Sequence, residues 1–159
     1  MKNKILICFG TRPEWLKVKP LIKILDKSQY SLLFTGQHPD LLNNINVDFK
    51  INMKSHHNRL DQIISDCMLQ FPDGDFNSVL VQGDTGSAFG CALAAYNRKL
   101  KIYYLEAGLR SYNLDHPYPE EAYRQMIARI SDVNLCPTKL SLKNLVNEHT
   151  NGVCHVIGN

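Results

Sequence analysis

The chain has 159 residues, of which 44% are hydrophobic and 21% charged, and its formal net charge is +3. This size and composition are typical of one globular domain, and the charge is too small to indicate a nucleic-acid or membrane-surface partner. No apolar run approaches the ~20 residues of a membrane-spanning helix, so we expect neither a nucleic acid nor a membrane among the partners.

Short apolar runs alternate with longer segments of helical periodicity. In chain order, strands are expected at residues 4–9, 30–35, 78–82, 101–105, 133–136 and 153–157. Helices are expected between them, at residues 13–28, 58–71, 86–98, 120–131 and 138–148. Strands separated by helix-length crossovers form βαβ units, so the sequence predicts an α/β fold with a mostly parallel sheet and helices on both faces.

The first strand leads into GTRPE, residues 10–14. Thr11 suits a helix N-cap, and the proline suits the first helical turn. Helix starts favour anions, to which Arg12 and Lys17 would add positive charge, and the alternative is a capped helix with two solvated cations. Pro20 falls inside the expected helix, and we expect it to kink the helix or displace its start.

The strand at 78–82 is followed by Asp84. Ligands of parallel sheets collect beyond the carboxyl ends of the strands, so Asp84 is either a site carboxylate or the N-cap of the next helix. Within that helix Gly86, Gly90 and Ala94 are spaced four apart. We expect this bare helix face to lie close to the sheet.

Glu106 ends the next strand, where a polar side chain needs a partner. We expect it to project into the crevice at the strand ends. Arg110 is one candidate partner, so a structural Glu106–Arg110 pair is the alternative to a catalytic role. Glu120 opens the following helix, where its charge interacts favourably with the helix dipole, and an ion pair with Arg124 is available.

Several acids and cations thus converge on the predicted crevice. Carboxylates that lie close together raise each other's pKa values and can divide into a base and an acid near neutral pH. The candidate catalytic residues are Asp84, Glu106 and Glu120. The candidate substrate-binding residues are Arg12, Lys17 and Arg110. The arrangement predicts proton transfer beside an anionic substrate.

The five cysteines form no C-x-x-C pair, and their odd number leaves any disulfide scheme incomplete. A reducing, cytoplasmic setting is the simplest interpretation. No spacing of histidine and cysteine fits a zinc site, so we expect no metal.

Four segments resemble the UDP-N-acetylglucosamine 2-epimerase family. They are GTRPEWLKVKPLI at 10–22, QGDTGSAFGCALAAY at 82–96, LEAGLRSYNLDHPYPEEAYRQMI at 105–127 and VIGN at 156–159. The resemblance implies a Rossmann-like domain, one half of a GT-B architecture with the active site between two domains. It also implies interconversion of UDP-N-acetylglucosamine and UDP-N-acetylmannosamine by elimination and re-addition of UDP, without a cofactor or metal. A hydrolysing branch, which releases N-acetylmannosamine and UDP, stays open as the alternative.

By the same resemblance, Arg12 and Lys17 bind the nucleotide sugar, and Asp84, Glu106 and Glu120 are the acid–base carboxylates.

Two further segments bear on the resemblance. GQHPDLL at 36–42 is similar to a segment that binds a second, allosteric substrate molecule in bacterial non-hydrolysing members, which makes Gln37 and His38 possible allosteric residues. The two residues after His38 differ from the usual ones, and Gln82 stands where the family often has histidine.

The resemblance also implies that residues 1–159 are the N-terminal Rossmann-like domain, with the C-terminal domain absent from them. The chain stops directly after its last expected strand, where we expect a domain boundary or a truncation. In the family the second domain supplies a catalytic histidine and most contacts to the nucleotide, so we expect this chain alone to be inactive or nearly so. A homo-oligomer is implied as well.

Two other classes stay open: a non-catalytic module that docks a separate partner chain, and one half of a glycosyltransferase. The block at 105–127 argues against the glycosyltransferase.

Overall fold

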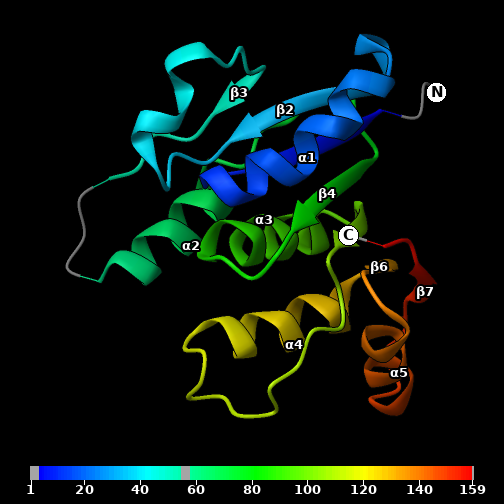
Figure 1. Cartoon of the computed structure of the whole chain (residues 1–159). Helices are drawn as coiled ribbons and strands as arrows, with labels where there is room; N and C mark the ends of the chain where they lie inside the picture. The colour runs from blue at the N-terminus through cyan, green and yellow to red at the C-terminus, as the bar shows by residue number, and fades with distance from the viewer. Residues whose placement is uncertain (1–3, 55–57, 159) are drawn as a thin grey trace.

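One parallel seven-stranded sheet organises the computed structural model, which describes residues 4–54 and 58–158 (Figure 1). The strands are β1 (Ile5–Phe9), β2 (Tyr30–Phe34), β3 (Phe49–Lys50), β4 (Ser78–Gln82), β5 (Lys101–Leu105), β6 (Val133–Cys136) and β7 (Val153–Val156). Their order across the sheet is β3-β2-β1-β4-β5-β6-β7, and each neighbouring pair is parallel. The predicted α/β fold with a parallel sheet is confirmed, and it is Rossmann-like.

The helices fall where the periodicity predicts them. They are α1 (Arg12–Ile24), α2 (Arg59–Leu69), α3 (Gly86–Asn97), α4 (Glu120–Ile130) and α5 (Lys139–Asn147), with two short 3-10 helices, η1 (Lys27–Gln29) and η2 (Pro39–Asn44). The first helix stops earlier than predicted, because η1 takes up the residues before β2. The sequence did not predict β3, whose two residues form no apolar run.

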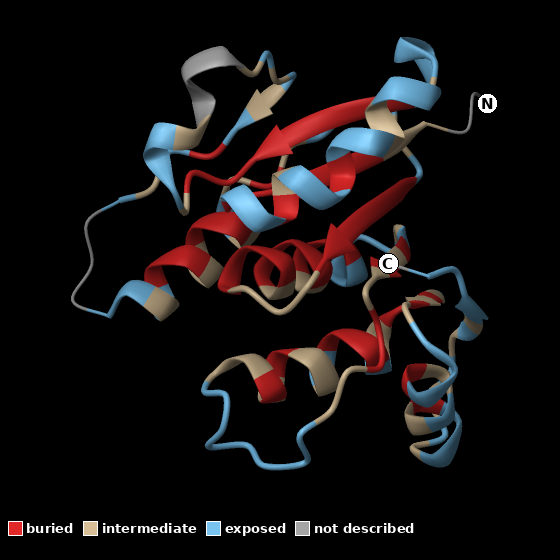
Figure 2. Cartoon of the chain, viewed as in Figure 1, coloured by how far each residue is buried: buried red, intermediate tan, exposed pale blue. Residues whose placement is uncertain are grey.

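Two apolar clusters, one on each face of the sheet, explain why the strands read as continuous apolar runs. Helix α1 covers one face, where its Val18 packs with Phe9 of β1 and Leu80 of β4. The other four helices contribute to the cluster on the opposite face, with Ile63, Ala92, Ile127 and Leu145 each no more than 2% exposed. Figure 2 shows the central strands buried between these layers. The predicted coverage of both faces is therefore confirmed.

The topology reverses between β1 and β4. From β1 the chain moves outward through β2 to β3, and it then returns to the other side of β1 and continues from β4 to β7. In open parallel sheets, ligands bind at such a switch point, beyond the carboxyl ends of the strands. The loops after β1 and β4 therefore mark where a site is expected.

Pro20 lies inside α1, which begins at Arg12, so of the two effects expected of this proline the displaced helix start is not found. The expectation that the bare face of α3 lies against the sheet is corrected by the packing. The bare face of α3 meets helix α2 rather than the sheet: a Cβ at Gly90 would lie 2.8 Å from the Cβ of Cys67 and 3.2 Å from the Cα of Ile64. Glycine thus permits close approach of two helices.

All five cysteines lie in the described part of the chain and have free thiols. Across residues 4–54 and 58–158, none of the helices combines the length and apolarity needed to cross a bilayer.

Neighbouring residues of α4 test how far the apolar cluster stabilises the element that carries the candidate acids. Ile127 is fully buried, whereas Met126 is 41% exposed. We expect Ile127→Ala to lower the free energy of unfolding by about 2–5 kcal/mol, because it leaves a cavity, and Met126→Ala to change it by less than about 1 kcal/mol. Urea denaturation of both variants measures the difference. Equal losses would contradict this packing.

Candidate active site

Glu14, in the first turn of α1, is only 2% exposed. Its Oε2 accepts hydrogen bonds from the backbone N–H groups of Gly10 and Thr11, both at 2.7 Å, and from the Thr11 hydroxyl at 3.0 Å. Thr11 is the N-cap of α1, as predicted, and forms a capping box with Glu14. Glu14 is not among the predicted site residues, although the T-x-x-E spacing of residues 11–14 is the pattern of a capping box.

The second oxygen of Glu14 joins α1 to α3. Glu14 Oε1 accepts a hydrogen bond from the Thr85 hydroxyl, and Thr85 Oγ1 accepts one from the N–H of Ala88 at 3.0 Å as the N-cap of α3. Burial raises the pKa of Glu14, and the hydrogen bonds from Thr85, Gly10 and Thr11 offset only part of that rise. One buried carboxylate thus links the two helix starts at the switch point.

A second polar link crosses the same place. A Cβ at Gly10 would lie 2.0 Å from Thr35 Oγ1 and 2.3 Å from Ser87 Oγ, so glycine leaves room for the 2.6 Å hydrogen bond between those hydroxyls. Gln37 Oε1 accepts from the Ser87 hydroxyl at 2.6 Å and from its N–H at 3.2 Å. The side chain of His38 is exposed, and its backbone N–H donates to the Gly10 carbonyl at 2.8 Å. Gln37 therefore contacts the start of α3, whereas His38 is at the surface.

Glu106 follows β5 with a φ of 67°, in the left-handed region that is uncommon for residues other than glycine. Its Oε2 accepts a hydrogen bond from Gln82 Nε2, and its Oε1 lies 3.9 Å from Lys17 Nζ. Glu106 and Lys17 also line a cavity of about 300 Å³ together with residues of α1, Pro137 and the segment after β7. The carboxylate thus lies at the strand ends beside open space. Residues with uncommon backbone conformations cluster at functional sites, so the positive φ of Glu106 also favours a functional role.

Asp84 follows β4 and pairs with Arg124 of α4. Arg124 Nε lies 2.7 Å and Nη2 2.6 Å from Asp84 Oδ2. The N-cap of α3 is Thr85, so the interpretation of Asp84 as that cap is wrong. Arg124 Nη1 also lies 3.4 Å from Glu121 Oε2, and among the described residues it forms no ion pair with Glu120. The pair suggested by helical spacing is therefore replaced by a pair between helix α4 and the loop after β4.

Glu121 is fully buried and holds the loop before α4. Its carboxylate accepts hydrogen bonds from Gln125 Nε2 at 2.9 Å and from the backbone N–H groups of Ser111 at 2.9 Å and Tyr112 at 3.2 Å. Burial acts to raise the pKa of Glu121, but these hydrogen bonds outweigh it, so its pKa lies below the ordinary value. The sequence did not separate this structural role from that of Glu120.

Glu120 is the first residue of α4 and is half-buried. Its Oε2 atom is buried and has no hydrogen-bond partner within the part of the chain that the structure describes. An unpaired buried carboxylate oxygen costs free energy. A donor supplied to this oxygen would therefore stabilise the protein.

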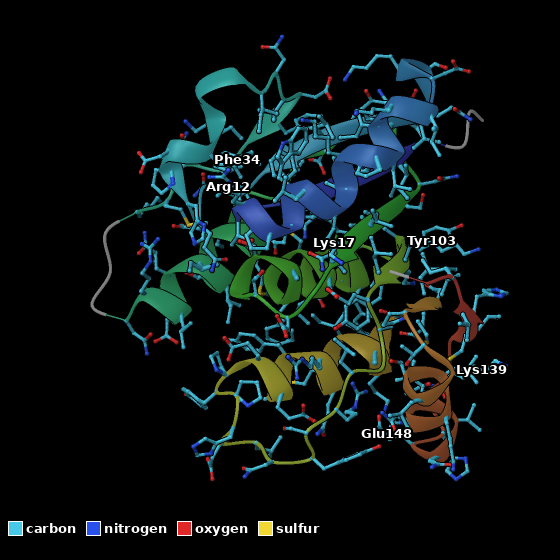
Figure 3. All side chains as sticks on the ribbon, in the orientation of Figure 1. Arg12, Lys17, Phe34, Tyr103, Lys139 and Glu148 are labelled. Atoms are coloured by element: carbon cyan, nitrogen blue, oxygen red, sulfur yellow. The ribbon has the colours of Figure 1, made fainter. Side chains whose placement is uncertain are left out.

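The three predicted cations have different surroundings. Arg110 donates to both carboxylate oxygens of Glu148, at 2.7 and 2.8 Å, and its side chain is fully buried. Neither the predicted substrate contact of Arg110 nor its pairing with Glu106 is supported by this geometry, which makes it a structural link to α5. Arg12 is exposed at the start of α1, with no hydrogen bond or ion pair to the described residues. Figure 3 shows Arg12 and Lys17 on α1, apart from Glu148.

The structure therefore brings Glu106 and Lys17 together beside the cavity at the end of β5. Asp84, at the end of the neighbouring strand β4, is paired with Arg124 of α4 instead. A carboxylate and a lysine that line one open cavity are suited to proton transfer on an anionic ligand.

Comparisons with known proteins point to one family. A family model for UDP-N-acetylglucosamine 2-epimerase matches residues 23–159. Curated relatives named UDP-N-acetylglucosamine 2-epimerase include one from Campylobacter jejuni, 40% identical over 164 residues, and one from Bacillus subtilis, 35% identical over 162 residues. These matches cover 95% and 93% of this chain but 43% and 42% of the relatives. The chain thus spans less than half the length of the curated relatives it matches.

Solved structures show the same similarity in three dimensions. The crystal structure of UDP-GlcNAc 2-epimerase from Neisseria meningitidis bound to UDP-GlcNAc has a TM-score of 0.89 and 34% identity, covering 98% of this chain and 46% of that one. The Methanocaldococcus jannaschii UDP-GlcNAc 2-epimerase in complex with UDP-GlcNAc and UDP has a TM-score of 0.86 and 28% identity, with the same two coverages of 98% and 46%. The similarity therefore extends over nearly all of this chain.

Glu14 and Glu121 should give opposite pH dependences. The raised pKa of Glu14 means that the folded chain keeps a proton which the unfolded chain releases above about pH 4.5, so this group lowers stability as pH rises through that window. The lowered pKa of Glu121 contributes stability that is present above about pH 4.5 and is lost as pH falls through its folded pKa.

We compare the free energy of unfolding of each variant with that of the unsubstituted chain. For Glu14→Gln we expect this difference to become more favourable from pH 4 to pH 7. For Glu121→Gln we expect it to become less favourable from pH 3 to pH 6. Chemical denaturation across this pH range measures both slopes. Slopes of the same sign would show that the two carboxylates do not have these surroundings.

Proposed function

This chain belongs to the UDP-N-acetylglucosamine 2-epimerase family, and we propose that it supplies the N-terminal wall of an active site that interconverts UDP-N-acetylglucosamine and UDP-N-acetylmannosamine. The observation that supports this most directly is the Glu106 carboxylate at the end of β5, beside Lys17 and the cavity that both residues line. It is a base candidate placed beside a cation and open to a ligand.

The proposed reaction begins with proton transfer to Glu106 from C2 of the sugar. The electron pair of the C2–H bond forms a C1–C2 double bond, the C1–O bond breaks, and its electron pair leaves with the diphosphate oxygen of UDP. Return of a proton to the other face of C2 and attack of the diphosphate oxygen on C1 give the epimer. Asp84 and Glu120 are the candidates to supply that second proton.

Charge at the helix starts supports binding of the diphosphate. The N-termini of α1 and α3 meet at the switch point through Glu14 and Thr85, so the positive ends of both helix dipoles lie beside the crevice. Arg12 and Lys17 add full charges from α1. Together they would stabilise the negative charge that develops on the leaving UDP.

We further propose that a second, C-terminal domain completes the cleft and that residues 1–159 form the N-terminal domain. Self-association into a homo-oligomer and a reducing, cytoplasmic setting belong to the same proposal. The five free thiols are compatible with such a setting.

Gln37 and His38 are proposed as part of a site for a second ligand. The Gln37 side chain bonds Ser87 at the start of α3, and the Gln37 carbonyl accepts from Arg59 Nη2 at 2.7 Å. A ligand that moves Gln37 would therefore disturb the start of α3 beside the candidate active site.

Completion of the cleft is tested with a fusion protein. This chain is joined to the part of the Campylobacter jejuni relative that follows its matched segment, and we call the fusion the completed protein. We expect the completed protein to epimerise UDP-N-acetylglucosamine and the chain alone to be at least ~10³-fold slower, because members of a catalytic set act as a unit. Nuclear magnetic resonance of the products measures the rate. Release of free N-acetylmannosamine would identify the hydrolysing reaction, and a folded but inactive fusion would favour a non-catalytic docking module.

The role of Glu106 is tested by solvent exchange. In D₂O we expect the completed protein to introduce deuterium at C2 and Glu106→Gln to reduce this by at least ~10³-fold, because an amide cannot accept the proton. Asp73→Asn is the matched control. Asp73 is exposed in the loop before β4, at the amino ends of the strands, whereas Glu106 lies at their carboxyl ends. Normal exchange in Glu106→Gln would remove this residue from the reaction.

A further inference from the structure

Gln82 is a buried polar residue for which the proposed reaction has no role so far. It is the last residue of β4, is 5% exposed, and lies in register with Leu105, the residue before Glu106. Its Nε2 donates to Glu106 Oε2. A buried amide at the end of a central strand is thus directed at the carboxylate of the adjacent strand.

The two oxygens of Glu106 have different neighbours. Oε2 accepts the hydrogen bond from the buried Gln82 side chain, whereas Oε1 lies 3.9 Å from Nζ of Lys17, whose side chain is 40% exposed. Lys17 and Glu106 both line the 300 Å³ cavity. Oε1 is therefore the oxygen on the side of the lysine, and Oε2 is held by a neighbour that is itself fixed by burial.

A glutamine differs from histidine, lysine and arginine, the charged or titratable side chains that could also donate to Glu106, because its amide carries no charge. Its amide stays neutral across the physiological pH range and keeps a donor at a fixed position. The left-handed backbone at Glu106 fixes the origin of the side chain, and Gln82 fixes its far end. Two independent constraints thus act on one carboxylate.

We propose that Gln82 is a positioning residue that holds Oε2 of Glu106 and so makes Oε1 the oxygen that accepts the substrate proton. This inference rests on the proposed function of Glu106 as the base. Gln82 contacts the carboxylate and does not line the cavity, so its loss should affect the chemical step more than substrate binding.

The contact itself is tested on this chain without any assay of activity. The side-chain NH₂ signals of glutamines are visible in ¹H–¹⁵N spectra, and we expect Glu106→Gln to shift the Gln82 signal because the acceptor loses its charge. Gln125, which donates to the Glu121 carboxylate at 2.9 Å, is the internal control and should not shift. A Gln82 signal that stays in place would overturn the contact and the proposal with it.

The positioning role is tested by Gln82→Met, a side chain of similar length without a donor. In the completed protein we expect kcat for deuterium exchange at C2 to fall about 10–100-fold, with KM changed less than about threefold, because misplacement of a catalytic group by about 1 Å has an effect of this size. Unchanged kcat, or equal changes in kcat and KM, would overturn the proposal.

Gln82→His is the second variant and keeps a donor. We expect it to recover most of the rate and to add a pH dependence around the ordinary imidazole pKa of about 6.5 that the unsubstituted protein lacks. It also serves if Gln82→Met fails to fold, because a pH profile unchanged by the histidine would itself contradict the contact. No exchange in the completed, unsubstituted protein, together with a shifted Gln82 signal, would refute the catalytic part and leave the hydrogen bond in place.

Discussion

The buried carboxylate of Glu14 is the interaction on which the geometry of the crevice depends. It accepts from the backbone of the loop after β1 with one oxygen and from the N-cap of α3 with the other. The starts of α1 and α3 are thereby joined at the switch point of the sheet. The candidate cations Arg12 and Lys17 are on α1 and Asp84 precedes α3, so this one group links the elements that carry these charges.

Three of the acids that follow β4 and β5 have partners of their own. Asp84 is paired with Arg124, Glu121 is held by backbone N–H groups, and Glu106 is shared between an amide and a lysine. Hydrogen bonds and opposite charges offset the repulsion between neighbouring carboxylates. Glu120 differs from them, since its buried Oε2 has no partner among the residues described. These acids therefore differ in their surroundings, although all of them lie in the loops and helix start that follow β4 and β5.

Local pattern predicted most of the fold but only part of the site. The alternation of strand-length apolar runs with helical segments determined the sheet, and the Thr11 cap followed from its neighbours in sequence. The side-chain partners did not follow, because they are far apart along the chain: 71 residues separate Glu14 from Thr85, 38 separate Arg110 from Glu148, and 24 separate Gln82 from Glu106. Such pairs depend on strand order and register, which no single motif contains.

The arrangement of acids around one half-cleft is tested most directly by a crystal structure of the completed protein with UDP-N-acetylglucosamine bound. We expect C2 of the sugar about 3–3.5 Å from Oε1 of Glu106, with the diphosphate beside the start of α1. A sugar bound at another edge of the sheet, with Glu106 still facing only Lys17 and Gln82, would contradict the proposed site.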